Sequence, residues 1–219
     1  MRINKLIALS TGLSRRSADS AIIQGRVRLN NKPASPGAEV TANDQVTLDS
    51  KILVVPSVLV TIMLNKPPGY VVSRMGQGSQ TIYNLLPKEH QVLKPVGRLD
   101  KDSSGLLLLT NDGQLANQLT HPKYAKTKVY QVKLDKKLTI RDKLVITDKG
   151  VLLADGISKF EIEPSKNSDL LLIIRLKEGR NRQIRRTFTA LGYHVLVLHR
   201  TNFGNYQLGK LKSGNWQLI

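Results

Sequence analysis

The sequence predicts an α+β protein with a small domain at residues 1–48 and a larger β-rich domain at residues 60–219. Three observations support this prediction. The first part combines two helical stretches with short alternating runs, residues 49–59 read as a connector that contains Pro56, and strand-length apolar runs recur from Val60 onward. A chain of 219 residues is also long enough for one small and one medium-sized domain.

Local signals in the first domain predict two helices followed by a hairpin. A helix around residues 5–9 should stop near Gly12. A second helix should run from an N-cap at Ser14 to a stop at Gly25. Charged and apolar residues then alternate over residues 26–29, as they do in a strand. The expected turn is Asn30-Asn31, and Val40, Val46 and Leu48 indicate further short strands.

In the second domain, apolar runs of strand length alternate with stretches of helical periodicity. One helix should end before His121-Pro122, because the residue before a proline disfavours helical backbone. The expected strands are 60–65, 105–110, 128–134, 170–176 and 194–200, and the expected helices are 113–119 and 181–191.

The charge balance indicates a polyanionic partner. Lysine and arginine number 34 against 16 aspartate and glutamate residues, which gives a formal net charge of +18. A field of that sign favours nucleic acid or an anionic membrane. A membrane partner needs a basic amphipathic helix or a long apolar span, and the longest apolar runs, residues 106–109 and 170–174, have only strand length. No apolar stretch typical of a secretory signal follows the N-terminus, so we expect a cytoplasmic protein that binds nucleic acid.

The sequence offers little for a metal or a redox group. It contains no cysteine, which removes thiolate ligands, thiolate nucleophiles and disulfides. The segment Asp100–Asn111 starts like a calcium-binding loop, but its twelfth position is asparagine where that loop needs glutamate. We therefore expect no metal. The histidines also lack the spacing of a metal-binding pair; they are His90, His121, His194 and His199.

A cluster of basic residues marks the first domain as a candidate RNA-binding surface. Arg15 and Arg16 fall in the first turn of the second expected helix, where the helix dipole disfavours cations, so we expect another interaction to use them. Arg26 and Arg28 share one face of the expected strand. We interpret the cluster as a phosphate-binding surface, and a solvated charged face is the alternative. Its members are Lys5, Arg15, Arg16, Arg26, Arg28 and Lys32.

The same stretch resembles the S4-like RNA-binding module, which is named after a bacterial small-subunit ribosomal protein. The resemblance is carried by Asn4-Lys5-Leu6, by Ser14-Arg15-Arg16 and by residues 25–30, which read Gly-Arg-Val-Arg-Leu-Asn. It covers nearly all of residues 1–48 and implies RNA binding. The module is found in several types of protein, so it implies nothing about catalysis.

A charged loop stands directly before a run of four leucines. Residues 97–105 read Gly-Arg-Leu-Asp-Lys-Asp-Ser-Ser-Gly, and four leucines follow at residues 106–109. Four consecutive leucines are typical of a strand that is buried on both faces. A charged loop fixed beside a core is a candidate for chemistry, because apolar walls strengthen electrostatic interactions. Asp100 is the main candidate, and a purely structural loop is the alternative.

This loop resembles the catalytic signature of pseudouridine synthases of the RsuA/RluB/RluE/RluF group. The resemblance continues through residues 64–69, 128–130 and 177–186 in the expected order, so it covers essentially the whole chain. These segments read Leu-Asn-Lys-Pro-Pro-Gly, Lys-Val-Tyr and Lys-Glu-Gly-Arg-Asn-Arg-Gln-Ile-Arg-Arg. One departure is Ser103, where many members carry threonine, and this exchange keeps the hydroxyl. The resemblance implies a catalytic domain over residues 60–219, with a mixed, mostly antiparallel sheet and helices packed beside it.

The resemblance also implies the isomerisation of a uridine to pseudouridine, with no metal and with no nucleotide or other cofactor. The bond from N1 of the base to the ribose breaks, the base turns, and the ribose is rejoined through C5. Asp100 is the implied catalytic carboxylate, whether it attacks the base, attacks the sugar or removes a ribose proton. The nucleotide must first be turned out of its helix or loop, and Arg98 is expected to enter the vacated space or to hold the backbone.

Other site residues follow from charge and from the same resemblance. An arginine of the expected helix at residues 181–191 would keep the Asp100 carboxylate ionised, and we choose Arg185 with Arg182 in reserve. Tyr130 is expected to stack on the uracil, with its hydroxyl near the C5 proton. The alternatives are phosphate contacts for the arginines and core packing for the tyrosine. The same resemblance implies that an apolar residue near Ile173 or Ile174 walls the pocket.

The expected substrate is structured ribosomal RNA, with the large-subunit 23S RNA favoured over the small-subunit 16S RNA. Two alternatives stay open: a non-catalytic RNA-binding or ribosome-assembly factor with the same fold, and a synthase that acts on transfer RNA. Residues 100–103 are similar to the RluF branch, whereas His121-Pro122-Lys123 is similar to the RsuA and RluB branches, so the target base is also open. We further expect a monomer with no membrane partner.

Overall fold

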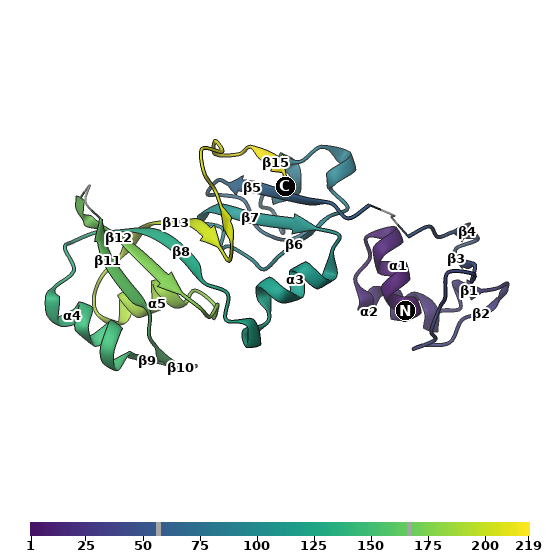
Figure 1. Cartoon of the computed structure of the whole chain (residues 1–219), viewed down its shortest axis with the longest axis horizontal. Helices are drawn as coiled ribbons and strands as arrows, with labels where there is room; N and C mark the ends of the chain where they lie inside the picture. Colours follow the sequence, from purple (N-terminus) through teal and green to yellow (C-terminus); the bar gives the residue numbers. More distant parts are fainter. Residues whose placement is uncertain (56–57, 166–167) are drawn as a thin grey trace. The chain divides into compact units, whose positions relative to one another are not determined.

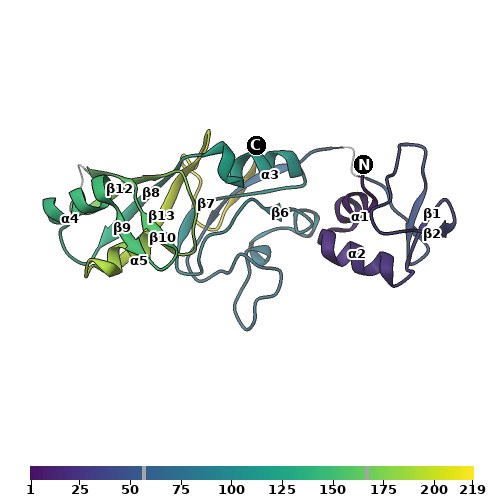
Figure 2. The same ribbon diagram turned by 90° about the horizontal axis from the view of Figure 1, so that it is seen from below.

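The computed structural model describes residues 1–55, 58–165 and 168–219. The chain divides into two compact units, and each unit has its own sheet and its own cluster of buried apolar residues (Figure 1 and Figure 2). The small unit comprises Met1–Val60 and Lys88–Lys94, and the large unit comprises Thr61–Pro87 and Pro95–Ile219.

The small unit begins with two helices whose ends fall where the capping residues predict. Helix α1 spans Ile3–Thr11 and ends at Gly12, which has a left-handed backbone conformation with a φ of +76°. Helix α2 spans Arg15–Ile23, and the hydroxyl oxygen of Ser14 accepts a hydrogen bond from the backbone N–H of Ser17 at 3.0 Å. That bond satisfies one of the donors that every helix N-terminus leaves free.

A four-stranded antiparallel sheet in the order β2-β1-β3-β4 completes the small unit. The predicted turn at Asn30-Asn31 joins β1 to β2, and both asparagines have positive φ angles. Strand β4 lies within the predicted connector at residues 49–59, and Pro56 lies outside the described residues. Val40 is buried but belongs to no strand. The strands are β1 (Val27–Leu29), β2 (Lys32–Pro33), β3 (Val46–Leu48) and β4 (Lys51–Ile52).

The large unit is built on a nine-stranded sheet, whose main path runs β11-β12-β8-β13-β7-β5-β15. The β13–β7 pair is parallel and the other pairs along this path are antiparallel, so the sheet is mixed and mostly antiparallel, as predicted. Strand β14 pairs with β13, and β6 pairs with β7. The strands are β5 (Thr61–Lys66), β6 (Lys94–Pro95), β7 (Ser104–Thr110), β8 (Lys128–Leu134), β11 (Glu161–Ser165), β12 (Ser168–Leu176), β13 (Val195–Phe203), β14 (Tyr206–Gln207) and β15 (Trp216–Leu218).

Helices and a second, two-stranded sheet accompany the large sheet. The predicted helices are present as α3 and α5, whereas α4 and the β9–β10 pair were not predicted. The Asp112 carboxylate caps α3 by accepting hydrogen bonds from two backbone N–H groups. Their bounds are α3 (Gly113–Thr120), α4 (Ile140–Leu144), α5 (Gln183–Ala190), β9 (Val151–Leu153) and β10 (Gly156–Ser158), with short turns of 3-10 helix at Ile82–Leu85, Lys88–His90 and Pro122–Tyr124 and of π-helix at Val145–Lys149.

Strand β7 lies between β13 and β5, and its four leucines, residues 106–109, are fully buried. This is the doubly covered strand that the leucine run predicts. Gly105 opens the run with a φ of +103°, and a Cβ atom there would come within 2.2 Å of the backbone oxygen of Arg200. Only glycine allows β7 and β13 to approach so closely. The loop at residues 97–103 is therefore fixed at its C-terminal end by a close backbone contact.

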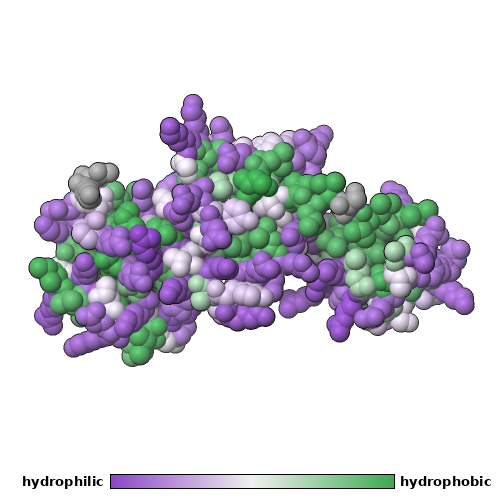
Figure 3. Space-filling view, in the orientation of Figure 1, coloured by the Kyte–Doolittle hydropathy of each residue, from purple (hydrophilic) through white to green (hydrophobic). Residues whose placement is uncertain are grey.

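The surface of both units is mostly polar on the face in Figure 3, with apolar patches between the hydrophilic side chains. Within residues 1–55, 58–165 and 168–219, no helix is both long enough and apolar enough to cross a membrane.

Candidate active site

A cleft of about 540 Å³ lies in the large unit, and Asp100 lines it. The cleft is formed by the charged loop at residues 97–103, by residues 119–130, by residues 176–184 and by strand β13. Three of the motifs that carry the sequence resemblance, at residues 97–105, 128–130 and 177–186, therefore meet around one cavity, although they are far apart in the chain. Arg98, Asp100, Ser103, Tyr130 and Arg182 are among the predicted or motif residues that line it.

Asp100 is paired with an arginine at the cleft. Its Oδ2 lies 3.7 Å from Nη1 of Arg182, and its side chain is 29% exposed. Arg182 also donates two hydrogen bonds to Asp102, at 3.0 and 3.2 Å. Burial by itself would raise the pKa of Asp102, but the hydrogen bond from Arg182 and the charge of Arg185 hold this pKa below its ordinary value. One guanidinium thus bridges both carboxylates of the loop.

The prediction that Arg185 pairs with Asp100 is corrected, because the ion pair is made by the residue kept in reserve, Arg182. Arg185 instead donates to the backbone oxygens of Asp102 at 3.1 Å and of Val195 at 2.8 Å, and its Nε lies 3.3 Å from Oδ2 of Asp102. The reason is the local backbone. Arg182 precedes α5 in a left-handed conformation with a φ of +46°, while Arg185 sits inside the helix. Arg185 therefore ties α5 to the loop beside Asp100 and to β13.

A buried lysine holds the other side of the same loop. Lys66, the last residue of β5, is fully buried, and its Nζ donates to the backbone oxygens of Pro67 at 3.0 Å, Lys101 at 3.4 Å and Ser103 at 2.7 Å. Burial lowers the pKa of Lys66 to about 8, against the opposing effect of the charges of Asp102 and Asp100. The residue belongs to the motif at residues 64–69, but its role was not predicted, because its acceptors are backbone atoms distant in sequence.

Tyr130 lies on β8, is 8% exposed and lines the cleft. Neither Ile173 nor Ile174, the predicted apolar wall, borders the cavity. Ile174 is fully buried and pairs in register with Tyr130 across the β12–β8 ladder. The apolar residue near Ile173 and Ile174 that borders the cavity is the next buried position of β12, and residues of α5 and β13 complete the wall. The wall residues are Leu176, Ile184 and Leu198.

The predicted RNA-binding residues fall into two groups. Arg98 is exposed and lines the cleft of the large unit. The others lie in the small unit, where Arg15 and Arg16 are exposed on the first turn of α2. Arg26 pairs with Asp49 at 2.5 Å, and Arg28 donates to the backbone oxygen of Asn31 at 3.0 Å. Lys32 is exposed and Lys5 is partly buried.

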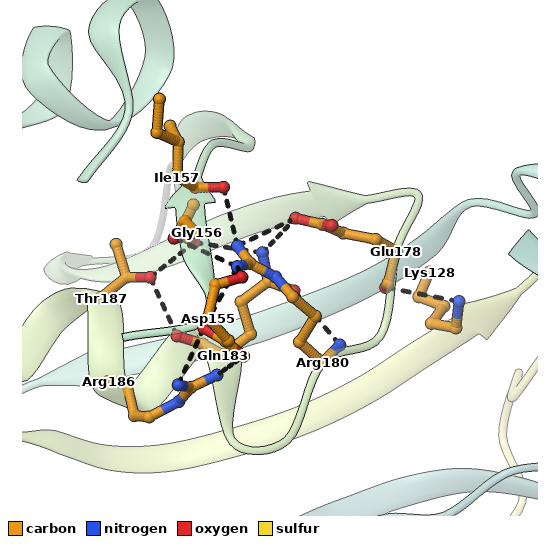
Figure 4. Close-up of polar contacts among 10 residues, drawn as sticks. Lys128, Asp155, Gly156, Ile157, Glu178, Arg180, Gln183, Arg186 and Thr187 are labelled. Carbon is orange, nitrogen blue, oxygen red and sulfur yellow. Dashed lines mark hydrogen bonds and ion pairs between the residues drawn. The ribbon is translucent and has the colours of Figure 1, made fainter. Parts of the chain in front are cut away.

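A network that was not predicted fixes the segment at residues 177–182 to β9 and β10 (Figure 4). Arg180 donates to the backbone oxygens of Asp155 at 3.0 Å, Gly156 at 3.1 Å and Ile157 at 2.8 Å. Arg186 donates two hydrogen bonds to the Asp155 carboxylate, at 3.0 and 2.7 Å. The hydrogen bond from its partner Arg186 holds the pKa of Asp155 below its ordinary value. Four of the basic residues of the last motif therefore form ion pairs inside the large unit: Arg180, Arg182, Arg185 and Arg186.

Two further cations border the cleft without having been predicted as site residues, Lys128 on β8 and Arg200 on β13. Arg200 is only 2% exposed, and its Nε donates to the backbone oxygen of Leu106 at 2.8 Å. No sequence signal isolates Arg200, which stands in a strand of ordinary composition. Within the described residues, no group of three or more histidine, aspartate or glutamate side chains is arranged to hold a metal ion.

Comparison with known proteins agrees with the motif pattern. Residues 60–190 match the model of the RNA pseudouridylate synthase family, and residues 1–46 match that of the S4 domain. An RNA pseudouridine synthase of Aquifex aeolicus, itself described as uncharacterized, is 38% identical over 99% of this chain and 89% of its own length. The ribosomal large subunit pseudouridine synthase B of Bacillus subtilis is 34% identical, over 98% of this chain and 90% of its own length.

A second group of relatives and a solved structure extend the likeness. The dual-specificity RNA pseudouridine synthase RluF of Escherichia coli strain K12 is 36% identical, over 99% of this chain and 74% of its own length. A crystal structure of a pseudouridylate synthase superposes with a TM-score of 0.72 at 31% identity, and covers 100% of this chain and 96% of that one. The chain belongs to the RNA pseudouridine synthase family, and its N-terminal part is an S4 domain.

Proposed function

We propose that this protein converts a uridine of ribosomal RNA to pseudouridine, with Asp100 as the catalytic carboxylate. The observation that carries the proposal is the position of that side chain: it is partly exposed, lines a cleft of about 540 Å³ and lies 3.7 Å from a guanidinium. Sites for small molecules typically have volumes of roughly 300–1,000 Å³, so the cleft has room for one everted nucleotide. An ionised carboxylate at such a cleft can reach a base or a ribose.

The other cleft residues take roles that fit this chemistry. Tyr130 presents a ring on which the uracil stacks, and Arg98 replaces the everted base or holds the backbone. Arg182 orients the Asp100 carboxylate, and Arg185 holds the adjacent loop backbone, so both act as positioning residues. The carboxylate then attacks the base, attacks the sugar or removes a ribose proton, and each route needs it ionised.

The proposed substrate is a structured segment of ribosomal RNA, with the large subunit favoured. Support comes from the net charge of +18, from the S4 domain and from the relative named for the large ribosomal subunit. We propose that the enzyme works as a monomer in the cytoplasm, where ribosomal RNA is present. Relatives named dual-specificity RNA synthases keep a second target open, and transfer RNA is the alternative substrate.

The test is a map of pseudouridines by chemical modification and primer extension, in cells with and without the gene. Large-subunit RNA, small-subunit RNA and transfer RNA are mapped in parallel. We expect at least one site in large-subunit RNA to disappear and to return with the wild-type gene. If every ribosomal pseudouridine persists in cells that lack the protein, the ribosomal substrate is wrong, and a site lost from transfer RNA would identify the alternative.

The same cells separate an enzyme from a non-catalytic RNA-binding factor. A gene that carries Asp100→Ala should fail to restore the site, while the purified variant binds the RNA within severalfold of the wild-type affinity. An Asp100→Ala gene that restores the site would show that another residue or another enzyme performs the chemistry.

A further inference from the structure

Two cations on neighbouring strands line the cleft, the buried Arg200 and the partly buried Lys128, and the proposed chemistry leaves both without a role. In the antiparallel β13–β8 pair, Arg200 lies opposite Tyr130 and Phe203 lies opposite Lys128. The guanidinium carbon of Arg200 lies 4.8 Å from the centre of the Phe203 ring, and Nζ of Lys128 lies 5.2 Å from it. One aromatic ring therefore contacts both positive groups, and all four residues line the cleft.

Arg200 is the more confined of the two. Its residue is 2% exposed, and its Nε is satisfied by the backbone oxygen of Leu106. Its Nη2 is buried and has no hydrogen-bond partner. A buried donor without an acceptor costs about 1–3 kcal/mol, and more when the group is charged. The guanidinium is thus held in place through one nitrogen while another is left without an acceptor.

Lys128 has only weak acceptors. Its Nζ lies 3.5 Å from the backbone oxygen of Glu178 (Figure 4). It lies 3.4 Å from the backbone oxygen of Lys126. Burial, followed by the positive charge of Arg200, lowers the pKa of Lys128 below its ordinary value. In the part of the chain that the structure describes, neither Lys128 nor Arg200 forms an ion pair with a carboxylate. The Asp100 carboxylate is engaged by Arg182.

Two like charges that are partly removed from water destabilise the protein, and the charge of Glu178 opposes this effect at Lys128. An anion that binds both cations lowers the remaining cost. We propose that Lys128 and Arg200 form an anion subsite of the cleft, which binds a phosphodiester group of the RNA next to the everted uridine. The assignment to RNA rests on the proposed function, whereas the subsite itself rests on the two cations. Lys128 and Arg200 contact the substrate, and Phe203 keeps both groups directed along one wall.

The first experiment uses inorganic phosphate as the probe and does not depend on RNA modification. The full-length protein is labelled with 13C-lysine and titrated with phosphate at constant ionic strength and pH, while the side-chain resonances are followed by NMR. The Lys128 resonance, assigned with the Lys128→Met variant, should shift saturably. The resonance of Lys133, an exposed residue of the same strand outside the cleft, should not.

The Arg200→Gln variant should weaken that titration at least about tenfold, as expected for the loss of one charge-assisted contact. Because Arg200 also supports the backbone of β7, this variant is used only if its circular dichroism and melting curve match those of a folded protein. If Arg200→Gln does not fold, the Lys128→Met variant tests the subsite through the RNA measurement below. A Lys128 resonance that does not respond to phosphate, or that responds no more than Lys133, overturns the subsite.

The second experiment identifies the source of the anion. RNA fragments that contain the mapped uridine carry a single neutral methylphosphonate linkage on its 5′ or its 3′ side. In an Asp100→Asn background, where RNA is bound but not converted, one of these linkages should weaken binding by about tenfold. With Lys128→Met added, the penalty should fall to about twofold or less, because the contact is already lost. With Lys133→Met added as the matched control, the penalty should stay.

The outcomes separate this inference from the proposed function. Suppose that phosphate binds at Lys128, but the methylphosphonate linkage lowers RNA affinity equally in all variants. The anion is then free phosphate and not RNA, which overturns the RNA assignment. If a ribosomal pseudouridine depends on the gene but the Lys128 resonance does not respond to phosphate, the proposed enzymatic function is supported and the anion subsite is overturned. A phosphate response in a protein that modifies no RNA would keep the subsite and remove the proposed function.

Discussion

Arginine side chains differ in exposure and in hydrogen-bond partners between the two units of this molecule. In the small unit, Arg26 pairs with Asp49 while both side chains are about half exposed, at 49% and 50%. In the large unit, the side chain of Arg185 is 11% exposed and reaches backbone oxygens of two separate segments. An exposed pair contributes only about 0–1 kcal/mol and is screened by salt. A confined guanidinium with several acceptors instead fixes the geometry of the segments it joins.

The number of basic residues in this chain therefore reflects two separate roles: long-range attraction of RNA and positioning of groups at the cleft. Cations on the small unit add to the attraction for a polyanion, which acts at long range and weakens as salt is added. Arg182 and Arg185 at the cleft arrange a carboxylate and a loop, so their loss should change the rate of the chemical step more than the affinity. Variants that remove one cation or its partner in each unit can therefore break or sharpen the distinction.

The largest contrast is expected between two carboxylates that each pair with an arginine. Asp102→Asn removes the charge that holds both Arg182 and Arg185, so the loop beside Asp100 loses its fixed position. The single-turnover rate should fall by about 100-fold, the size expected for a small misplacement of reacting groups. Asp49→Asn, which removes the partner of Arg26, should leave this rate unchanged. Equal effects of the two variants on the rate would remove the distinction between the units.

A smaller effect is expected from Lys66→Met, which leaves three backbone oxygens without their donor. The free energy of unfolding should fall by about 1–3 kcal/mol at neutral pH, as measured by urea denaturation. The lysine should also give a pH signature. Its pKa is lowered to about 8 in the folded protein, so between there and the ordinary value near 10.4 the unfolded chain binds more protons than the folded chain.

The free energy of unfolding contributed by this group therefore rises as the pH increases through that window. The difference in stability between wild type and Lys66→Met isolates the group from other titrating lysines and tyrosines. It should increase in favour of the wild type above pH 8. A difference that stays constant or shrinks there would mean that Lys66 does not carry the lowered pKa.

The smallest effect on the rate is expected from the surface of the small unit. The double variant Arg15→Gln and Arg16→Gln removes two exposed cations from the first turn of α2. The dissociation constant for RNA should rise severalfold, and the slope of its logarithm against that of the salt concentration should fall by up to about two. The single-turnover rate at saturating enzyme should not change. An unaltered salt slope would show that these arginines do not contact phosphates.

Much of the fold could be predicted from local patterns, because its elements follow local physical rules. Strand β8 occupies the predicted residues. Helix α1 ends at Gly12 and helix α2 begins after its N-cap Ser14, as predicted. The leucine run identified the buried strand β7 and, with it, the anchored loop that carries Asp100.

The sequence-based predictions of the site fail where a residue's hydrogen-bond partner is distant in sequence or where the backbone adopts a left-handed conformation. Arg182 and Arg185 lie one helical turn apart, and sequence does not reveal that Arg182 adopts a left-handed conformation before α5. The roles of Lys66 and Arg200 depend on backbone oxygens of other strands, which carry no side-chain signature. The apolar wall of the cleft is set by the register of β12 on β8, and that register is a tertiary property.

The most direct test compares the two carboxylates of the loop in purified enzyme with mapped RNA. Pseudouridine formation is followed in a single turnover for wild type, Asp100→Asn and Asp102→Asn, and RNA affinity is measured for each. We predict that Asp100→Asn lowers the rate by a factor on the order of 10⁴ or more, as for the loss of a catalytic nucleophile or base, with affinity within severalfold of wild type. Asp102→Asn should keep a measurable rate. An Asp100→Asn enzyme that remains within tenfold of wild type, or that is no slower than Asp102→Asn, would contradict the assignment of the chemistry to Asp100.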